Sequence, residues 1–239
     1  MNILYLITAR GGSKGIPKKN IQKISGIPLV AYKAISAQKC KYTGRIMVST
    51  DDEEIMNVCK QYDVDVPFIR PQHLSQDDSS SIDVVLHAMQ WIEKHDSCSY
   101  DYIFLLEPSS PFATYTDFNN SLDIIINSDA DTLLSMRSVD VNRVFINNLD
   151  QNGGLSYFYE SIQNLKYLHR QAQNQEYTPN GCIYISKWNY MKQNKSFHSK
   201  NSKPYLMKRE YSLELDETID LEFAKFLVKK NIIDISSWK

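Results

Sequence analysis

The first twenty residues limit the possible folds of this chain more than any other stretch. An unbroken apolar run at residues 3–7 leads directly into a loop with three glycines, Gly11, Gly12 and Gly15. Such a run is typical of a strand that is buried on both faces. The glycines let the following backbone turn tightly and approach a ligand without a Cβ clash. The stretch therefore predicts the first strand and loop of an α/β sheet.

The same loop is strongly basic. Residues 1–50 contain nine lysines and arginines and no acid before Asp51, although the net charge of the whole chain is only -1. Main-chain N–H groups and cationic side chains in such a loop suit a polyphosphate. The Walker motif does not fit because Lys18 and Lys19 are followed by Asn20, and the dinucleotide motif does not fit because two glycines are adjacent. A glycine-rich turn with solvated lysines is the alternative.

Residues 9–20 resemble the opening signature of the acylneuraminate cytidylyltransferases, the CMP-sialic acid synthetases and their CMP-legionaminic acid synthetase-like relatives. In that family an Ala-Arg-x-x-Ser-Lys-Gly-x-Pro-x-Lys-Asn loop holds the triphosphate of CTP, and each specified position matches here. The resemblance runs essentially from end to end. It implies that the nucleotide is bound by Ala9, Arg10, Gly11, Gly12, Ser13, Lys14, Lys19 and Asn20.

Length and composition set the class of protein. A chain of 239 residues with 42% hydrophobic and 23% charged residues is expected to form one globular domain, residues 1–239, with a sizeable core. The near-zero net charge argues against a nucleic-acid partner. We expect no membrane partner, because no apolar stretch reaches the roughly 20 residues of a span. The four cysteines form no CxxC pair, and no secretion signal precedes the first strand, so we expect a cytoplasmic protein.

Strand-like and helical patterns alternate through the first part of the chain. This alternation predicts a doubly wound, mostly parallel α/β sheet, and the resemblance implies a Rossmann-like (GT-A-like) nucleotidyltransferase. Ligands bind such sheets at the carboxyl ends of the strands, where the loops at Arg10, residues 77–81 and Glu107 are expected to emerge. Strands are predicted at residues 45–49, 64–69, 102–106 and 132–136, and helices at residues 28–40, 53–59, 82–93 and 114–126.

The alternation breaks between about residues 140 and 208, a stretch rich in Asn, Gln and Tyr. Its pattern predicts an irregular excursion from the sheet, with isolated β-like pieces such as residues 182–186. The resemblance implies a dimerisation arm here, exchanged between the subunits of a homodimer. A returning strand at residues 210–215 and a final helix at residues 217–229 are predicted to follow.

Glu214 and Asp216 place two carboxylates two residues apart. On a strand they would share one face, and carboxylates beside a triphosphate are natural Mg²⁺ ligands. An exposed strand edge that carries charges is the alternative. The resembling family has Asp-x-Asp here, which implies that Asp216 binds Mg²⁺ together with Glu214, although Glu214 replaces the family's first Asp.

The segment that begins at Arg70 resembles the family's cytosine and ribose region. The resemblance implies base contacts by Arg70, Ser79 and Ser81. Without it, Arg70 would be interpreted as a surface arginine and the serines as helix caps.

Residues 105–111 resemble the family's Leu-Leu-Gln-Pro-Thr-Ser-Pro, whose Gln faces the acyl sugar. Glu107 replaces that Gln, and an ionised Glu only accepts hydrogen bonds. This change favours sugar hydroxyls or amides and disfavours a nearby substrate carboxylate, so it favours a legionaminate-type sugar over N-acetylneuraminate. Residues 179–184, Pro-Asn-Gly-Cys-Ile-Tyr, resemble a second sugar-site string. The implied sugar-binding residues are Glu107, Ser109, Ser110, Arg170, Asn180, Tyr184 and Phe197, although such aromatic residues are also typical of cores and interfaces.

The resemblance implies that the chain activates a nine-carbon 2-keto acid sugar with CTP, giving a CMP-sugar and pyrophosphate. The catalytic residues would be Arg10, Lys14, Lys19 and Asp216. Three alternatives remain: a 3-deoxy-manno-octulosonate cytidylyltransferase, a glycosyltransferase with an Asp-x-Asp metal site, and a non-catalytic nucleotide-binding protein.

Overall fold

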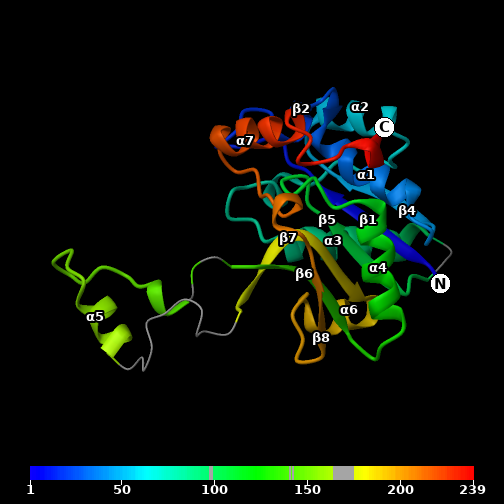
Figure 1. The fold of residues 1–239 in the computed structure, drawn as a ribbon. Coiled ribbons are helices and arrows are strands. Elements are labelled where there is room, and N and C mark those ends of the chain that lie inside the picture. The colour runs from blue at the N-terminus through cyan, green and yellow to red at the C-terminus, as the bar shows by residue number, and fades with distance from the viewer. Residues whose placement is uncertain (97–98, 140, 142, 164–174) are drawn as a thin grey trace.

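The computed structural model describes residues 1–96, 99–139, 141, 143–163 and 175–239 (Figure 1). Its described strands form a six-stranded sheet in the order β4-β1-β5-β7-β6-β8 and a small two-stranded sheet, β2-β3. In the large sheet only β7 is antiparallel to its neighbours, which confirms the mostly parallel α/β prediction. The strands are β1 Ile3–Thr8, β2 Lys23–Ile24, β3 Ile27–Pro28, β4 Gly44–Ser49, β5 Tyr102–Leu106, β6 Thr132–Ser138, β7 Tyr177–Lys187 and β8 Ser202–Leu206.

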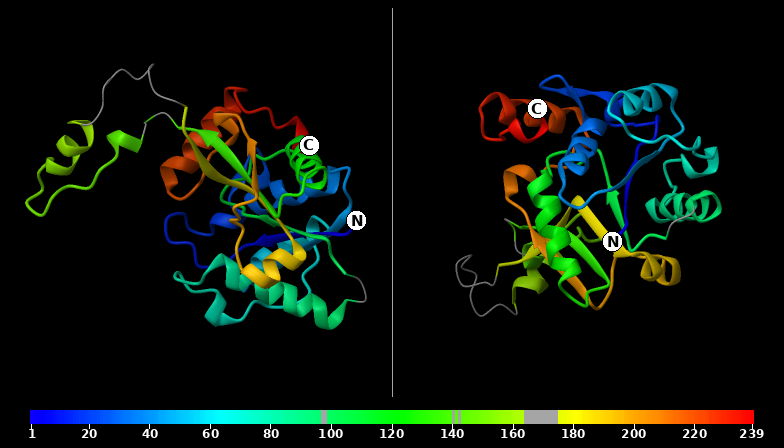
Figure 2. Two further views of the ribbon diagram at one scale, coloured as in Figure 1. Left: turned by 90° about the horizontal axis from the view of Figure 1, so that it is seen from below. Right: turned by 90° about the vertical axis from the view of Figure 1, so that its right-hand side faces the viewer.

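Strand β1 lies between β4 and β5 and is buried on both faces. Tyr5 and Ile7 pack into the core on one face, while Leu4 and Leu6 pack into the core on the other. Helices α1, α2 and α4 cover the first face, and α3 and α6 cover the second, as Figure 2 shows. The continuous apolar run at the start of the sequence is therefore explained by a strand without a solvent face.

The predicted helices are present, and local capping explains where two of them begin. Asp52 accepts a hydrogen bond from the Ile55 N–H at the start of α2, and Thr114 and Asp117 form a capping box at the start of α4. The helices are α1 Leu29–Lys39, α2 Glu53–Gln61, α3 Ser81–His95, α4 Tyr115–Ile126, α5 Ser156–Gln163, α6 Trp188–Asn194 and α7 Thr218–Lys229.

Two predicted strands are wrong. Residues 64–69 contribute only an isolated bridge between Met47 and Asp65. Residues 210–215 begin within a short 3-10 turn, Arg209–Tyr211, and form no strand. The Leu215 N–H instead donates to the Ser109 carbonyl at 2.8 Å, so this segment is tied to the loop after β5 and not to a sheet ladder.

The prediction that residues 140–208 leave the sheet is wrong for much of that range. Strands β7 and β8 and helix α6 belong to the main body. Only the described residues between β6 and β7 project from it. This projecting segment carries a 3-10 turn, Arg143–Phe145, and helix α5 (Figure 1).

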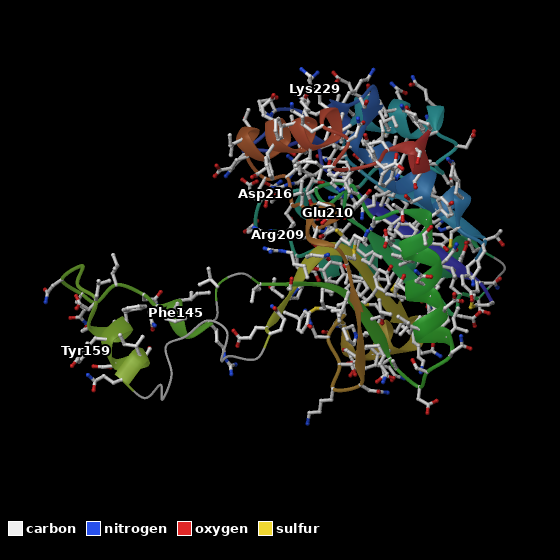
Figure 3. All side chains as sticks on the ribbon, viewed as in Figure 1. Phe145, Tyr159, Arg209, Glu210, Asp216 and Lys229 are labelled. Atoms are coloured by element: carbon white, nitrogen blue, oxygen red, sulfur yellow. The ribbon has the colours of Figure 1, made fainter. Side chains whose placement is uncertain are left out.

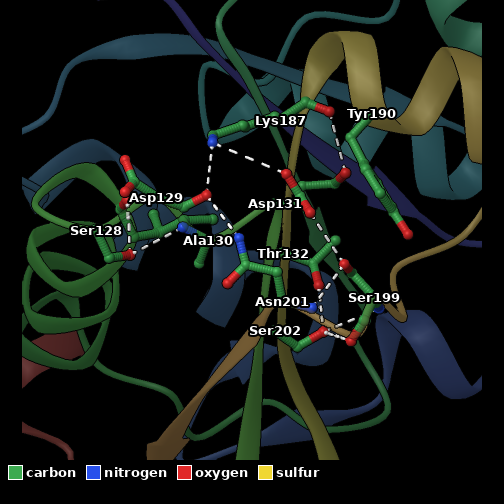
Figure 4. Close-up of polar contacts among 12 residues, drawn as sticks. Ser128, Asp129, Ala130, Asp131, Thr132, Lys187, Tyr190, Ser199, Asn201 and Ser202 are labelled. Carbon is green, nitrogen blue, oxygen red and sulfur yellow. Dashed lines mark hydrogen bonds and ion pairs between the residues drawn. The ribbon is translucent and has the colours of Figure 1, made fainter.

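Hydrogen bonds between polar groups join neighbouring strands at one end of the large sheet. The Lys187 ammonium and the Asn201 amide both donate to the Asp129 carbonyl, at 3.0 and 2.9 Å (Figure 4). Thr132 and Ser202 hydroxyls meet at 2.7 Å. These contacts join the starts of β6 and β8 to the end of β7, at the end of the sheet opposite the carboxyl ends of the parallel strands. Within the described residues, no helix is long and apolar enough to cross a membrane.

Candidate active site

A cavity of about 460 Å³ lies at the carboxyl ends of β1 and β5. Its walls come from the basic loop after β1, the segment at residues 70–81, the loop after β5 and the loop before α7. The position agrees with the expectation for a doubly wound sheet. The predicted site residues that line it are Arg10, Ser13, Lys14, Lys19, Asn20, Arg70, Ser79, Ser81, Glu107, Ser109 and Asp216.

Hydrogen bonds between side chains and the backbone hold the basic loop in place. The Asn20 amide donates to the Arg10 carbonyl at 2.8 Å, and the Gly11 N–H donates to Asp51 Oδ1 at 3.0 Å. Ala9 is buried, and its N–H donates to the Ser49 carbonyl of β4. This hydrogen bond attaches the start of the loop to the sheet. Neither Ala9 nor Gly11 and Gly12 line the cavity.

Gly15 joins the first loop of the chain to the loop before α7. A Cβ at Gly15 would overlap the carbonyl oxygen of Asp216, whereas a Cβ at Gly12 would meet nothing within 4 Å. Glycine is therefore required at position 15 for close backbone approach. This packing holds Asp216, which Figure 3 labels in the segment before α7, in the wall of the cavity.

Lys19 and Asp216 face each other across that junction. The Lys19 ammonium lies 3.2 Å from Asp216 Oδ1, and the Asp216 side chain is 71% exposed. Among the described residues no group of three or more His, Cys, Asp or Glu side chains is placed to hold a metal. Asp216 and Glu214 are two carboxylates on one non-strand loop, and burial together with Asp216 raises the pKa of Glu214. Glu214 and Asp216 therefore influence each other, as predicted, but they lie on a loop and not on the strand that we expected.

The Asp77 carboxylate forms ion pairs with two cations of the basic loop, Arg10 and Lys14. Its carboxylate lies 2.8 Å from an Arg10 Nη2 and also forms an ion pair with Lys14. The hydrogen bond from Lys14 holds the pKa of Asp77 below its usual range. The Lys14 side chain is 81% exposed, so little except Asp77 restrains it.

Arg70 is buried, contrary to its interpretation as a surface arginine. Its guanidinium donates to the hydroxyl and the carbonyl of Ser49, and burial lowers its pKa to about 10. Ser79 closes a turn by donating to the His73 carbonyl at 3.0 Å. The N-cap of α3 is Ser80, which leaves the hydroxyls of Ser79 and Ser81 on the cavity wall.

Glu107 lies at the end of β5, deep in the cavity. Its hydrogen bond from Ser81 Oγ is long, at 3.5 Å. Burial raises the pKa of Glu107, and the nearby Lys33 ammonium opposes that shift. Ser110, the residue after the wall residue Ser109, is fully buried, and its hydroxyl has no hydrogen-bond partner among the described residues.

The remaining predicted sugar residues that the structure describes are not on the cavity wall. Asn180 is buried and donates to Ser212 Oγ at 2.8 Å. Tyr184 and Phe197 pack together with ring centroids 5.6 Å apart, on the α3 side of the sheet. Burial raises the pKa of Tyr184 to about 12. The prediction for Arg170 lies outside the described residues.

Sequence reasoning missed several wall residues and one buried cation. Asp77 was read only as part of a polar loop, although an acid beside a basic loop is a signal for an ion pair. Lys33 was missed because it lies within an apolar helical pattern. A lysine among the apolar positions of a buried helix is the signal that could have identified it. The unpredicted wall residues are Thr8, Leu74, Gln76, Asp77, Val84 and Pro108.

Comparison with known proteins gives consistent matches. Residues 4–237 match the cytidylyltransferase family. The chain is 31% identical over 228 residues to post-translational flagellin modification protein B of Campylobacter coli, covering 95% of both chains. It is 31% identical over 232 residues to CMP-N,N'-diacetyllegionaminic acid synthase of Legionella pneumophila, covering 97% of this chain and 98% of the relative. A solved CMP:2-keto-3-deoxy-manno-octonic acid synthetase in complex with CTP shares the fold, with a TM-score of 0.70 at 13% identity over 97% of this chain and 100% of that chain.

Proposed function

Because this chain belongs to the cytidylyltransferase family, we propose that it activates a nonulosonic acid with CTP. The anomeric hydroxyl attacks the α-phosphorus, the bond to the β-phosphate oxygen breaks, and CMP-sugar and pyrophosphate form as the hydroxyl proton is lost. One observation carries the proposal: the basic loop, the exposed Asp216 carboxylate and Glu107 all line the same cavity. Such a cavity has room for a triphosphate and a sugar at opposite ends.

The basic end would hold the triphosphate. Arg10, Lys14 and Lys19 are placed to neutralise the β- and γ-phosphates, and phosphoryl transfer depends mainly on such positioning and charge stabilisation. Asp77 is the counter-ion that the phosphates would displace from Arg10 and Lys14. Arg70, Ser79 and Ser81, on the cavity wall formed by residues 70–81, would take the base and ribose.

Asp216 and Glu214 are the groups that would hold Mg²⁺. Mg²⁺ binds through one or two carboxylates plus substrate phosphates, and an exposed carboxylate beside a phosphate-binding loop fits that requirement. When bound, the ion would supply charge neutralisation at the phosphate oxygens. Lys19 would then move its ion pair from Asp216 to the phosphates.

The sugar is proposed to be of the legionaminate type. Glu107 at the inner end accepts hydrogen bonds, which suits a sugar rich in amide N–H and hydroxyl donors. Relatives named for legionaminic acid activation support the same choice. A 3-deoxy-manno-octulosonate substrate is the second candidate, because the solved synthetase named for that acid shares the fold.

The projecting segment is proposed to pair with a second copy of this chain in a homodimer. Helix α5 buries none of its residues within one chain. Its surroundings expose several large apolar side chains, and apolar groups gathered on a projection are typical of an interface. They include Ile146, Leu149, Leu155 and Tyr159. We further propose a cytoplasmic enzyme whose product serves surface polysaccharide synthesis, such as lipopolysaccharide or capsule.

Pyrophosphate release tests the proposal. The purified protein is given CTP and Mg²⁺ with N-acetylneuraminate, diacetyllegionaminate, pseudaminate or 3-deoxy-manno-octulosonate in parallel, and the Lys14→Ala variant is the control. Turnover of a nine-carbon acid is expected, with diacetyllegionaminate fastest. Turnover of octulosonate alone would favour the second candidate, and CTP binding without turnover of any acid would favour a non-catalytic protein.

A further inference from the structure

Lys33, in the middle of α1, is completely buried. Its ammonium donates to the Cys182 carbonyl of β7 at 2.7 Å and lies 6.0 Å from the centroid of the Phe118 ring. A buried ammonium is costly unless an opposite charge compensates it. Burial accordingly lowers the pKa of Lys33, while nearby acids oppose that shift. The cation needs a counter-charge.

Two carboxylates are close enough to supply it, Glu107 and Asp117. Asp117 is already engaged: it accepts from the N–H and hydroxyl of Thr114, both at 2.7 Å, and from the Tyr205 hydroxyl at 2.8 Å. Within the described part of the chain, the only hydrogen bond to the Glu107 carboxylate is the 3.5 Å contact from Ser81. Glu107 is therefore the carboxylate whose charge lacks local compensation.

The sheet register relates Glu107 to the strand residue that binds the Lys33 ammonium. Strands β5 and β7 are antiparallel, and Leu105 pairs with Tyr184. Continued by two residues, that register sets Glu107 opposite Cys182, whose carbonyl accepts the Lys33 hydrogen bond. Glu107 lines the cavity and Lys33 does not, so the ammonium reaches this point of the sheet from the α1 side, away from the substrate.

We propose that Lys33 determines sugar specificity by acting as the buried counter-charge of Glu107. The pair keeps Glu107 as a carboxylate toward the cavity and so selects a sugar that presents hydroxyl or amide N–H donors at that point. This inference rests on the proposed function. A neutral Glu107 would donate a hydrogen bond as well as accept one, and the site would then resemble one with a Gln.

The other charged groups around Glu107 explain why a buried cation is needed. Burial and the Glu214 carboxylate favour the protonated form of Glu107, whereas Lys33, Lys19 and the Ser81 hydroxyl favour the carboxylate. Lys19 also faces Asp216, and the proposed phosphates would draw it away. Lys33 alone stays in place throughout, because it is enclosed by the core.

A double-mutant cycle on sugar kinetics tests the pairing. The variants are Lys33→Met, Glu107→Gln and the double variant, with Lys60→Met on the exposed face of α2 as the matched control. Lys33→Met is expected to raise the KM for the sugar about tenfold or more and to leave the KM for CTP within about twofold. Glu107→Gln alone is expected to raise the KM for the sugar by a similar factor, and the double variant is expected to be little worse than either single variant, because each change removes the same carboxylate. Independent effects that multiply in the double variant would overturn the proposal.

Thermal melting of the same proteins gives a readout that needs no turnover. At pH 7 the Lys33→Met variant is expected to melt several degrees lower, and adding Glu107→Gln should restore part of the loss. A purely structural role of Lys33 predicts no restoration. If Lys33→Met does not fold, Glu107→Gln alone decides the matter: it removes the counter-charge, so an unchanged melting temperature would refute the pair. Absence of turnover in the parent protein would refute the proposed function, not the pairing, so the two failures are distinguishable.

Discussion

Lys19 Nζ and Asp216 Oδ1 lie 3.2 Å apart, although 197 residues separate them in the chain. The contact brings the first loop of the fold against the last loop before α7. The cavity between these loops therefore exists only when both ends of the chain are folded together. Activity should accordingly be lost by changes at either end that leave the core intact.

Asp216→Asn should remove most activity while the fold persists. The amide keeps the size of the side chain but loses the charge that would bind Mg²⁺, so kcat should fall about 100-fold or more. Because Asp216 is exposed, the melting temperature should change little. Pyrophosphate release and circular dichroism measure the two effects, and Glu222→Gln on the outer face of α7 is the control. Near-normal turnover would show that Asp216 is not a metal ligand.

Gly15→Ala should disrupt the site by sterics alone. The added Cβ would overlap the Asp216 carbonyl, and overpacking of this kind costs about 1–3 kcal/mol. The loop before α7 should shift, so both stability and kcat should fall. Gly12→Ala is the matched control, because a Cβ there meets nothing within 4 Å. Equal tolerance of both substitutions would contradict the close approach seen at Gly15.

Asp77→Asn should strengthen CTP binding at low salt. The Asp77 carboxylate competes with phosphate for Arg10 and Lys14, and its removal should lower the KM for CTP severalfold. Exposed ion pairs contribute little to stability, so the unfolding free energy should stay nearly constant. Titration of CTP at low and high ionic strength measures the effect. A weaker affinity would mean that Asp77 positions the cations and does not compete for them.

The projecting segment should control assembly. Ile146→Asp and Leu149→Asp place charges on side chains that are 66% and 62% exposed within one chain. The core should be untouched, while a dimer that buries these side chains should dissociate. Light scattering measures the mass, and Lys60→Met serves again as a control. A mass that does not change with either substitution would contradict the proposed role of the segment.

Elements with a single strong periodicity were predicted well from sequence. Strand β5 and helix α4 follow local apolar patterns and local caps, and their positions agree with the structure. The β-like piece at residues 182–186 lies within β7, but the first half of that strand was not predicted, because it contains Pro179 and Gly181 and both residues are unfavourable in strands. Glycine is required at position 181 because its φ is positive and because an added Cβ would overlap the Ser110 and Glu214 side chains.

The site was predicted in part for a similar reason. Side chains in a contiguous motif, such as Arg10, Lys14 and Lys19, identify themselves by their spacing. The role of Lys33 depends on Glu107 and Cys182, which belong to other elements of the fold. Local sequence patterns cannot predict contacts between residues so far apart in the chain. The carboxylates at 214 and 216 were expected on a strand, but tertiary contact with Ser109 holds that segment as a loop.

The most direct test of the account is the fate of the anomeric oxygen. Diacetyllegionaminate labelled with ¹⁸O at the anomeric hydroxyl is incubated with the protein, CTP and Mg²⁺, and the products are followed by ³¹P NMR and mass spectrometry. The account predicts CMP-sugar that retains the label in its phosphodiester, together with an equal amount of unlabelled pyrophosphate. Release of inorganic phosphate with CDP, or unlabelled CMP without CMP-sugar, would contradict attack by the sugar hydroxyl on the α-phosphorus.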